Sequence, residues 1–288
     1  LQTLGARLEV EECEFRDFSG KAMIRSGCKR DNRDKLRGIR VSRCVFKTNP
    51  KGSAVSSVGP ALVEDCTLEN IHRGLSFDDW TGKWGHQPRR DYKDIGTGNT
   101  QCLEIASNGF DRKGTPTAAQ VYRNVIIEKW KAADSGYIHE GIEYGEFRPT
   151  RGKIYENVLV GHISPCLYNK GDENEWFNNT LVLRGDAFLY HCYGLRCRYY
   201  NHLQVGGRAA MNNQEAVDKG IAGRWLSKGC TSEDHVLEYS CLWKVKSNFL
   251  KGKGYFEADP KFVDPENMDF RLRFDSPCIN KGTGSRDG

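Results

Sequence analysis

The sequence predicts an all-β fold: a right-handed parallel β-helix, which is a solenoid with coils of about 22 residues, closed by a C-terminal capping segment. Three observations predict this fold. A short apolar motif recurs along the chain, its shortest interval recurs three times, and apolar residues alternate with polar ones inside each copy as they do in strands. The right hand follows from the chirality that governs parallel crossovers.

The recurrent motif reads LEVEECEF in its first copy, and its sixth position holds cysteine or asparagine in every copy. These positions are Cys13, Cys44, Cys66, Asn124, Asn157, Asn179, Asn201 and Cys241. If each copy is one coil, these residues stack in a single inward column at about 4.8 Å, the spacing between strands of a sheet. Stacked asparagines then hydrogen-bond to one another and to the turn backbone, and cysteines fill the same small slot.

A second apolar patch follows about nine residues after each column position, so each unit reads as a strand, a turn, a second strand and a variable loop. A unit this short cannot bury its own apolar face, whereas stacked units bury a continuous core. A leucine-rich repeat has a unit of similar length and is the main alternative, but the LxxLxL frame that it needs is absent. We expect Cys13, Cys44 and Cys66 of this column to be buried thiols, because parallel side chains have poor disulfide geometry.

The expected division of the chain is a β-helix over residues 1–253 and a capping segment over residues 254–288. Within the β-helix, long loops are expected at 78–118 and 134–151, where the sequence exceeds the coil length. The cap is needed because the last coil leaves strand edges open, and open edges invite aggregation.

The C-terminal stretch contains the motifs DPKFVDP from Asp259, MDFRL from Met268 and SPCINKG from Ser276. These motifs resemble the closing segment of secreted bacterial β-helix proteins that are related to polysaccharide lyases. Together with the repeats, the resemblance spans roughly residues 8–283. It implies the β-helix fold and a secreted, periplasmic or cell-surface location. No catalytic motif of those proteins is matched, so the resemblance assigns no catalytic residue.

Composition excludes several classes of protein. Hydrophobic residues make up 38% of the 288 residues and charged residues 28%, so the chain can build a core and is not wholly disordered. The net charge of +5 comes without a recognition motif, so we expect no nucleic-acid partner. No apolar run approaches the roughly 20 residues of a membrane span. The 11 cysteines, an odd number, include no CxxC pair for a zinc ribbon. The chain opens without methionine or a signal-peptide pattern, and we expect it to be processed or part of a longer protein.

Chemistry-bearing residues gather in one row, 11 to 13 residues after each column position. The row contains Tyr137, Tyr168, Lys170, Tyr190 and His191. Tyr168 and Tyr190 are separated by the shortest interval of the repeat, so they should stack directly on neighbouring coils. Aromatic faces suit sugar rings, and lysine or histidine can neutralise a carboxylate or remove a proton. The two tyrosines also fit a purely structural stacking ladder.

The two long loops should flank this row, and long ordered loops on a rigid scaffold are usually functional. The loop at 78–118 contributes Asp78, Asp79, Trp80, Trp84, Arg89 and Arg90. The loop at 134–151 contributes His139, Glu140, Glu143 and Arg148. We expect the loops to form the walls of a groove that crosses the coils near residues 137–191.

These residue types favour a polysaccharide lyase that cleaves an acidic, uronate-containing glycan by β-elimination. The reaction needs a cation to neutralise the carboxylate, a base for the adjacent proton and an acid for the leaving oxygen. The candidate catalytic residues are Lys170, His191, Tyr168, His139 and Arg148. The candidate substrate-binding residues are Tyr137, Tyr190, Trp80, Trp84, Arg89 and Arg90. Calcium is an alternative neutralising cation, with Asp78, Asp79, Glu140 and Glu143 as its oxygen ligands.

Two other functions stay open. A glycoside hydrolase needs a pair of carboxylates, for which Asp79 with Glu140 or Glu143 are candidates. A non-catalytic β-helix, serving as an adhesin, a surface domain or a carbohydrate-binding domain of a larger protein, needs no turnover. The expected partner is an acidic polysaccharide.

Overall fold

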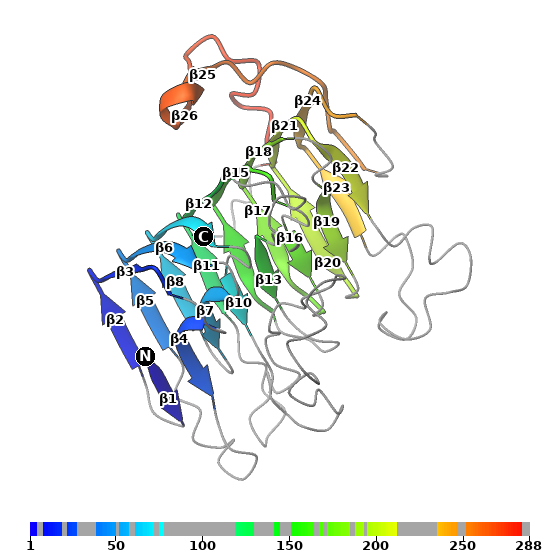
Figure 1. The fold of residues 1–288 in the computed structure, drawn as a ribbon. Helices are drawn as coiled ribbons and strands as arrows, with labels where there is room; N and C mark the ends of the chain where they lie inside the picture. The colour runs from blue at the N-terminus through cyan, green and yellow to red at the C-terminus, as the bar shows by residue number, and fades with distance from the viewer. Residues whose placement is uncertain are drawn as a thin grey trace.

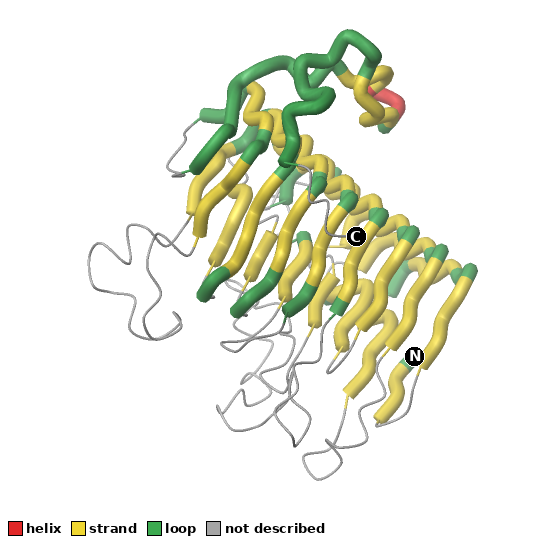
Figure 2. Tube along the Cα trace, turned by 180° about the vertical axis from the view of Figure 1, so that it is seen from behind, coloured by secondary structure: helices red, strands yellow, loops and turns green. Residues whose placement is uncertain are grey.

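The computed structural model confirms the predicted fold: three long parallel sheets stack their coils into a β-helix (Figure 1). Each sheet has eight strands and takes every third strand in chain order, so each coil adds one strand to each sheet. Seen from behind, the sheets run along the length of the molecule (Figure 2). The structure describes residues 1–4, 8–18, 22–27, 39–49, 52–57, 61–71, 75–77, 119–129, 141–144, 151–163, 167–169, 172–184, 188–192, 195–211, 235–246 and 252–283.

Neighbouring strands within these three sheets are parallel. The first sheet contains β1 (Gln2–Leu4), β4 (Ala22–Gly27), β7 (Ser53–Ser57), β10 (Leu75–Phe77), β13 (Ile142–Tyr144), β16 (Leu167–Asn169), β19 (Phe188–Cys192) and β22 (Arg208–Met211). The second contains β2 (Leu8–Glu11), β5 (Ile39–Ser42), β8 (Ala61–Glu64), β11 (Gln120–Tyr122), β14 (Lys153–Tyr155), β17 (Glu175–Phe177), β20 (Cys197–Tyr200) and β23 (His235–Glu238). The third contains β3 (Glu14–Arg16), β6 (Val45–Asn49), β9 (Thr67–Ile71), β12 (Val125–Glu128), β15 (Val158–Gly161), β18 (Thr180–Leu183), β21 (Leu203–Val205) and β24 (Cys241–Trp243).

One expected loop contains a strand. Within 134–151, residues Ile142–Tyr144 form β13, which pairs with β10 on one side and β16 on the other. The physical reason is that every coil must supply a first-sheet strand, or the sheet would be interrupted between β10 and β16. The other expected loop, 78–118, connects β10 to β11 and lies outside the described residues.

The core is built from one inward position per strand. In the second sheet these buried positions hold Val10, Val41, Val63, Val121, Ile154, Trp176, Tyr199 and Leu237. In the third sheet the matching row contains Phe46, Leu68, Ile126, Leu159, Leu181 and Leu242, with the polar Gln204 between the last two. Burying each large apolar side chain is worth about 1.5–3 kcal/mol. Equivalent residues stack at the strand spacing, so the core is continuous from coil to coil.

Two residues connect the second sheet to the third in every coil. The first of them has a left-handed backbone, with φ between 46° and 57°. These residues, which we name the turn column, are Glu12, Arg43, Asp65, Arg123, Glu156, Asn178, Asn201 and Tyr239. Charges alternate over its first five members, from Glu12 to Glu156: Arg43 pairs with Glu12 at 3.0 Å, and Arg123 pairs with Asp65 at 2.7 Å.

The second residue of each connection forms the inward column, which confirms six of the eight predicted positions and corrects the other two. The column contains Cys13, Cys44, Cys66, Asn124, Asn157, Asn179, His202 and Ser240. Cys44 and Cys66 are buried as expected, whereas Cys13 is exposed, because no described coil precedes it to cover its side chain. Asn201 belongs to the turn column, and Cys241 is the first residue of β24. The backbone shows this register, because the N–H of Leu203 donates to the Asn179 carbonyl at 3.0 Å.

A single extra residue explains the shift to His202. Gly161 pairs with Leu183, whereas Leu167 pairs with Tyr190, and the second pair is separated by one more residue along the chain than the first. The extra residue therefore lies between Leu183 and Tyr190, in the connection from the third sheet to the first. Every later position of that coil moves by one relative to a strict repeat.

The capping segment crosses the last coil and then folds on itself (Figure 1). Phe256 forms a parallel bridge with Cys241, and Asn201 exchanges two hydrogen bonds with the backbone of Thr283, at 2.8 and 2.9 Å. Beyond Phe256 the cap contains β25 (Phe262–Asp264), the short 3-10 helix η5 (Pro265–Asn267) and β26 (Asp269–Leu272), with the two strands antiparallel. Among the residues described, no helix is long and apolar enough to span a bilayer.

Candidate functional site

Four of the predicted site residues lie in described strands of the first sheet: Glu143 in β13, Tyr168 in β16, and Tyr190 and His191 in β19. The other predicted residues lie outside the described part of the chain. These are Asp78, Asp79, Trp80, Trp84, Arg89, Arg90, Tyr137, His139, Glu140, Arg148 and Lys170. Glu143 is thus the sole described member of the predicted calcium set.

Glu143, Tyr168 and His191 form one row across three successive coils. Tyr168 is opposite Glu143 in the pairing of β16 with β13, and His191 is opposite Tyr168 in the pairing of β16 with β19. Adjacent strands lie about 4.8 Å apart, so these three residues occupy consecutive positions along the β-helix axis. We name this set the acid–base row. It alternates with fully buried positions such as Ile142 and Leu167 on the preceding residues.

The predicted stacking of Tyr168 on Tyr190 is wrong. Tyr190 pairs with Leu167, and the residue opposite Tyr168 is His191. The cause is the extra residue between Leu183 and Tyr190 described above. Because side chains alternate between the two faces of a strand, a slip of one residue exchanges the faces. Tyr190 therefore leaves the row and His191 enters it.

A buried tyrosine anchors the first strand of the row. Tyr144 follows Glu143 in β13, is fully buried, and its hydroxyl accepts a hydrogen bond from the Ala119 backbone N–H at 3.0 Å. Its ring leaves no room for a side chain at Gly152, where an added Cβ would collide with three atoms of the tyrosine side chain. Tyr144 could not be predicted from the sequence, because a lone tyrosine in an expected loop carries no pattern.

Buried asparagines anchor the second strand of the row. Asn169 follows Tyr168 in β16 and is fully buried. Its Nδ2 donates to the Cys197 sulfur at 3.0 Å, and its Oδ1 accepts from Asn174 Nδ2 at 2.7 Å. The Oδ1 of Asn174 in turn accepts from the Gly152 backbone N–H at 2.8 Å. These bonds hold the first sheet to the start of the second. The cluster of asparagines in YNKGDEN is the signal that would have indicated them.

The second sheet carries an aromatic stack of Tyr122, Tyr155, Phe177 and Tyr200. The ring centroids are 4.8, 4.8 and 5.1 Å apart, with interplanar angles of 7°, 1° and 6°. Each ring face is covered by the next ring, so the stack exposes ring edges and not the faces on which sugars pack. We interpret it as a structural ladder between coils.

The hydroxyl end of this stack joins a charged network. The Tyr122 hydroxyl donates to the Glu64 carboxylate, which also accepts from Arg40 Nη2 at 2.9 Å. The bond from Tyr122 is the foremost cause that lowers the pKa of Glu64, and the same bond raises the pKa of Tyr122 to about 12. Glu64 is 7% exposed, so the pair ties β8 to β11 and is closed to a ligand.

A pocket of about 370 Å³ lies between the third sheet and the cap. Val182, Val205 and Trp243 line it from the outer face of the sheet, and Pro260 and Phe262 line it from the cap. An indole beside aliphatic side chains gives this pocket an apolar side, on which the CH face of a sugar can pack.

Cations surround the same pocket. Lys244 lies over the indole with its Nζ 5.8 Å from the ring centroid, and Lys261 and Arg273 line the cap side. The last two share one carboxylate, that of Asp275, at 2.9 and 3.4 Å. Asp259 also lines the pocket. Three cations against two carboxylates leave a weakly positive pocket with one apolar side.

No family model matches the chain, and no curated protein matches it. Two places in the described part of the chain are candidate functional sites: the acid–base row on the first sheet and the pocket between the third sheet and the cap.

Proposed function

We propose that this protein acts on an acidic, uronate-containing polysaccharide, as a lyase that cleaves by β-elimination at the acid–base row. The observation that supports the proposal is the register of Glu143, Tyr168 and His191, which puts three proton-transfer groups on consecutive coils. A chain of sugars laid across stacked coils meets such groups in sequence. The resemblance of the closing segment to secreted β-helix proteins adds the substrate class.

Each residue has a role in this proposal. His191 removes the proton next to the uronate carboxyl group, because imidazole titrates near neutral pH. Tyr168 donates a proton to the leaving glycosidic oxygen. Glu143 binds sugar hydroxyls. Lys170 or Arg148, from segments that border the first sheet in sequence, neutralises the uronate carboxylate and so stabilises the developing negative charge.

The test is an assay on alginate, pectate and glycosaminoglycans, each with calcium and with a chelator. β-Elimination yields an unsaturated uronate that absorbs in the near ultraviolet. Such a product from any of these glycans supports the proposal. If none of these glycans yields the unsaturated product, the proposal is overturned. Release of reducing ends without absorbance indicates a glycoside hydrolase instead.

Substitutions in the acid–base row test whether the activity is located there. We expect His191→Asn and Tyr168→Phe each to lower the turnover rate by about 100-fold or more. Tyr155→Phe is the matched control, because it removes a tyrosine hydroxyl from the second sheet and should leave turnover unchanged. Melting curves of all three variants check that the fold is kept. Activity that survives both first-sheet substitutions would move the site away from this row.

A non-catalytic glycan-binding protein is the second candidate, and the pocket beside Trp243 is the observation that favours it. We expect Trp243→Ala to weaken binding of a uronate oligosaccharide by roughly tenfold, measured by calorimetry. Tyr255→Ala is the control, since Tyr255 is 40% exposed on the cap and does not line the pocket. Equal loss in both variants, or no loss in either, would remove this candidate.

A further inference from the structure

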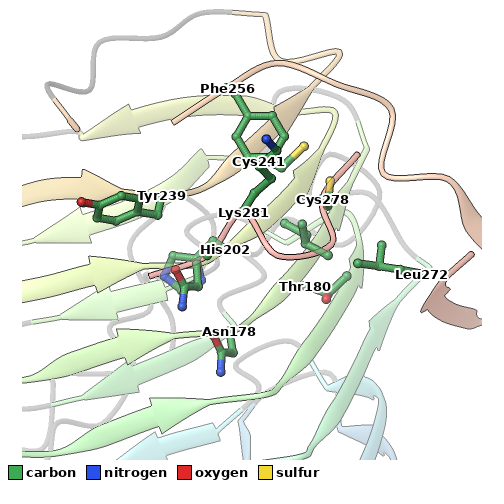
Figure 3. Close-up of a pocket in the computed structure, with 12 residues that line it drawn as sticks. Asn178, Thr180, His202, Tyr239, Cys241, Phe256, Leu272, Cys278 and Lys281 are labelled. Atoms are coloured by element: carbon green, nitrogen blue, oxygen red, sulfur yellow. The ribbon is translucent and has the colours of Figure 1, made fainter. Parts of the chain in front are cut away.

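Two cysteine thiols from different parts of the chain meet where the cap closes the β-helix. Cys241 begins β24 in the last coil, and Cys278 lies in the chain that follows β26 of the cap. Both line a cavity of about 250 Å³ between the third sheet and the cap. Figure 3 shows the two sulfur atoms beside one another at the edge of this cavity.

This pair differs from the thiols of the inward column. Cys44 and Cys66 occupy equivalent positions on neighbouring coils, so their side chains project in parallel, which is poor geometry for a disulfide. Cys241 and Cys278 are not equivalent positions of a repeat. They belong to segments that approach each other across an interface, and the bridge between Cys241 and Phe256 already fixes the cap at this point.

The surroundings give the two thiols different reactivity. Cys241 is 2% exposed, and its sulfur donates to the Ala258 carbonyl at 3.1 Å. Burial first, and the neighbouring Cys278 second, raise the pKa of Cys241 to about 12. Cys278 is half-buried. An oxidant in solution therefore reaches Cys278 first, and Cys241 reacts second.

We propose that Cys241 and Cys278 form a disulfide that fastens the capping segment to the last coil. The oxidant is a small-molecule disulfide such as oxidised glutathione. The Cys278 thiolate attacks it, forms a mixed disulfide and releases one glutathione thiolate. Cys241 then loses its proton to solvent, attacks the Cys278 sulfur and releases the second glutathione. Two protein thiols are oxidised, and one molecule of oxidised glutathione is reduced to two thiols.

Backbone hydrogen bonds at Lys253 and Phe256 hold the start of the cap to the last coil, but the described residues beyond Ala258 have few attachments to the coils. Between residues 252 and 283, Pro260 and Ser276 are the residues that are buried, and Phe274 is 92% exposed. The exchange between Asn201 and Thr283 supplies two hydrogen bonds. A covalent link at Cys278 would therefore add a large part of what holds this segment over the open strand edges.

Peptide mapping tests the proposal on the full chain. Cleavage after glutamate yields the fragments 239–257 and 267–288, each with a single cysteine, Cys241 in the first and Cys278 in the second. After treatment with oxidised glutathione, we expect a linked pair of these fragments that a reductant separates. The fragments that carry Cys44 and Cys66 should stay unlinked, which makes them the internal control.

The consequence for the cap is measured separately. We expect oxidation to raise the melting midpoint of the protein by roughly 5 °C or more, because the link constrains the unfolded chain. Cys278→Ser and Cys241→Ser should each abolish both the linked fragments and the shift. If the thiols of Cys241 and Cys278 in the folded protein can still be alkylated after oxidation, and no linked pair of their fragments appears, the proposal is wrong. A linked pair without any shift in the midpoint would refute the fastening role.

Discussion

The backbone N–H of Asn179 donates a hydrogen bond to Nδ1 of His202 at 3.3 Å, at the point where the inward column changes from asparagine to histidine. One coil earlier, the N–H of Asn157 donates in the same way to Oδ1 of Asn179 at 3.0 Å. An Nδ1 that accepts carries no proton, so a neutral imidazole continues the column as an amide oxygen would. His202 is fully buried, and this burial lowers its pKa to about 3.

The buried His202 should make the protein less stable in mild acid. The unfolded chain binds a proton at this residue below about pH 6.5, whereas the folded chain does not until about pH 3. The contribution of His202 is thus fully present above pH 6.5 and is lost by about 1.4 kcal/mol per pH unit as the pH falls towards 3. Urea unfolding at several pH values measures this slope.

His202→Asn is the matched variant. The Oδ1 of the new asparagine can accept from the Asn179 N–H, and the asparagine side chain does not titrate. We expect its free energy of unfolding to change less than that of the wild type between pH 6.5 and pH 4.5, because the carboxylates that titrate near the lower limit do so in both proteins. Parallel curves for the two proteins would contradict the assignment of a neutral buried imidazole.

The asparagine ladder predicts a large cost for losing one member. Asn157 Oδ1 accepts from Asn124 Nδ2 at 3.0 Å, and Asn157 Nδ2 donates to Asn179 Oδ1 at 2.9 Å. Asn157→Ala leaves buried donors and acceptors without partners, so we expect a loss of about 2–4 kcal/mol in the free energy of unfolding. The control is Asn178→Gly in the turn column, where φ is 53° and glycine fits, with a change of about 0.5 kcal/mol or less. Equal effects from both would show that the ladder adds nothing specific.

Gly152 connects the stability of the scaffold to the acid–base row. Gly152→Ala should displace the Tyr144 ring, and with it the strand that carries Glu143. We expect a loss of about 2–4 kcal/mol, since the ring has no free space to enter. Tyr144→Phe keeps the ring and loses the bond to Ala119, which should cost about 1–2 kcal/mol. Chemical denaturation measures the free energy of unfolding of both variants. If Gly152→Ala lost less than Tyr144→Phe, the Tyr144 ring would be free to move.

The pair of Tyr122 and Glu64 predicts a second acid-dependent contribution. The pKa of Glu64 is lowered in the fold, so this contribution is present above the ordinary value of 4.5 and is lost as the pH falls through the lowered pKa. Tyr122→Phe removes the foremost cause of the lowering. We expect the variant to lose about 1–2 kcal/mol at pH 7 and to approach the wild type in acid, where Glu64 is protonated. NMR titration of the Glu64 carboxyl would show its pKa moving upward in the variant, and an unchanged value would disprove the role of Tyr122.

The fold was predictable because the constraint that produces it repeats. The turn between the second and third sheets takes a small inward residue in seven of the eight coils, and in six of these the residue is cysteine or asparagine. Cys44, Cys66, Asn124 and Asn157 therefore predict the register from the sequence. The assignment of Asn201 failed because the extra residue of its coil lies in a connection that has no such constraint.

The candidate site was predictable only in part, for the same physical reason. Tyr168 and His191 lie on strands, so the repeat predicts which sheet contains them. The partner of Tyr168 on the next coil depends on the length of that coil, which has one residue more than the strict repeat. Asn169 and Asn174 were missed because their bonds join two different sheets, so their spacing does not follow the repeat, although both lie in the asparagine cluster YNKGDEN. Most of the other candidates lie in insertions, where no repeat constrains the chain.

The alternating charges of the turn column also fix the order of the coils. Glu12, Arg43, Asp65 and Arg123 face one another in sequence along the axis, each beside a neighbour of opposite sign. Deleting the coil of Asp65 would set two guanidinium groups together, and deleting the coil of Arg43 would set two carboxylates together. Removing a single coil from this half of the solenoid would therefore bring like charges together, whereas the neutral Asn178 and Asn201 further along add no such repulsion.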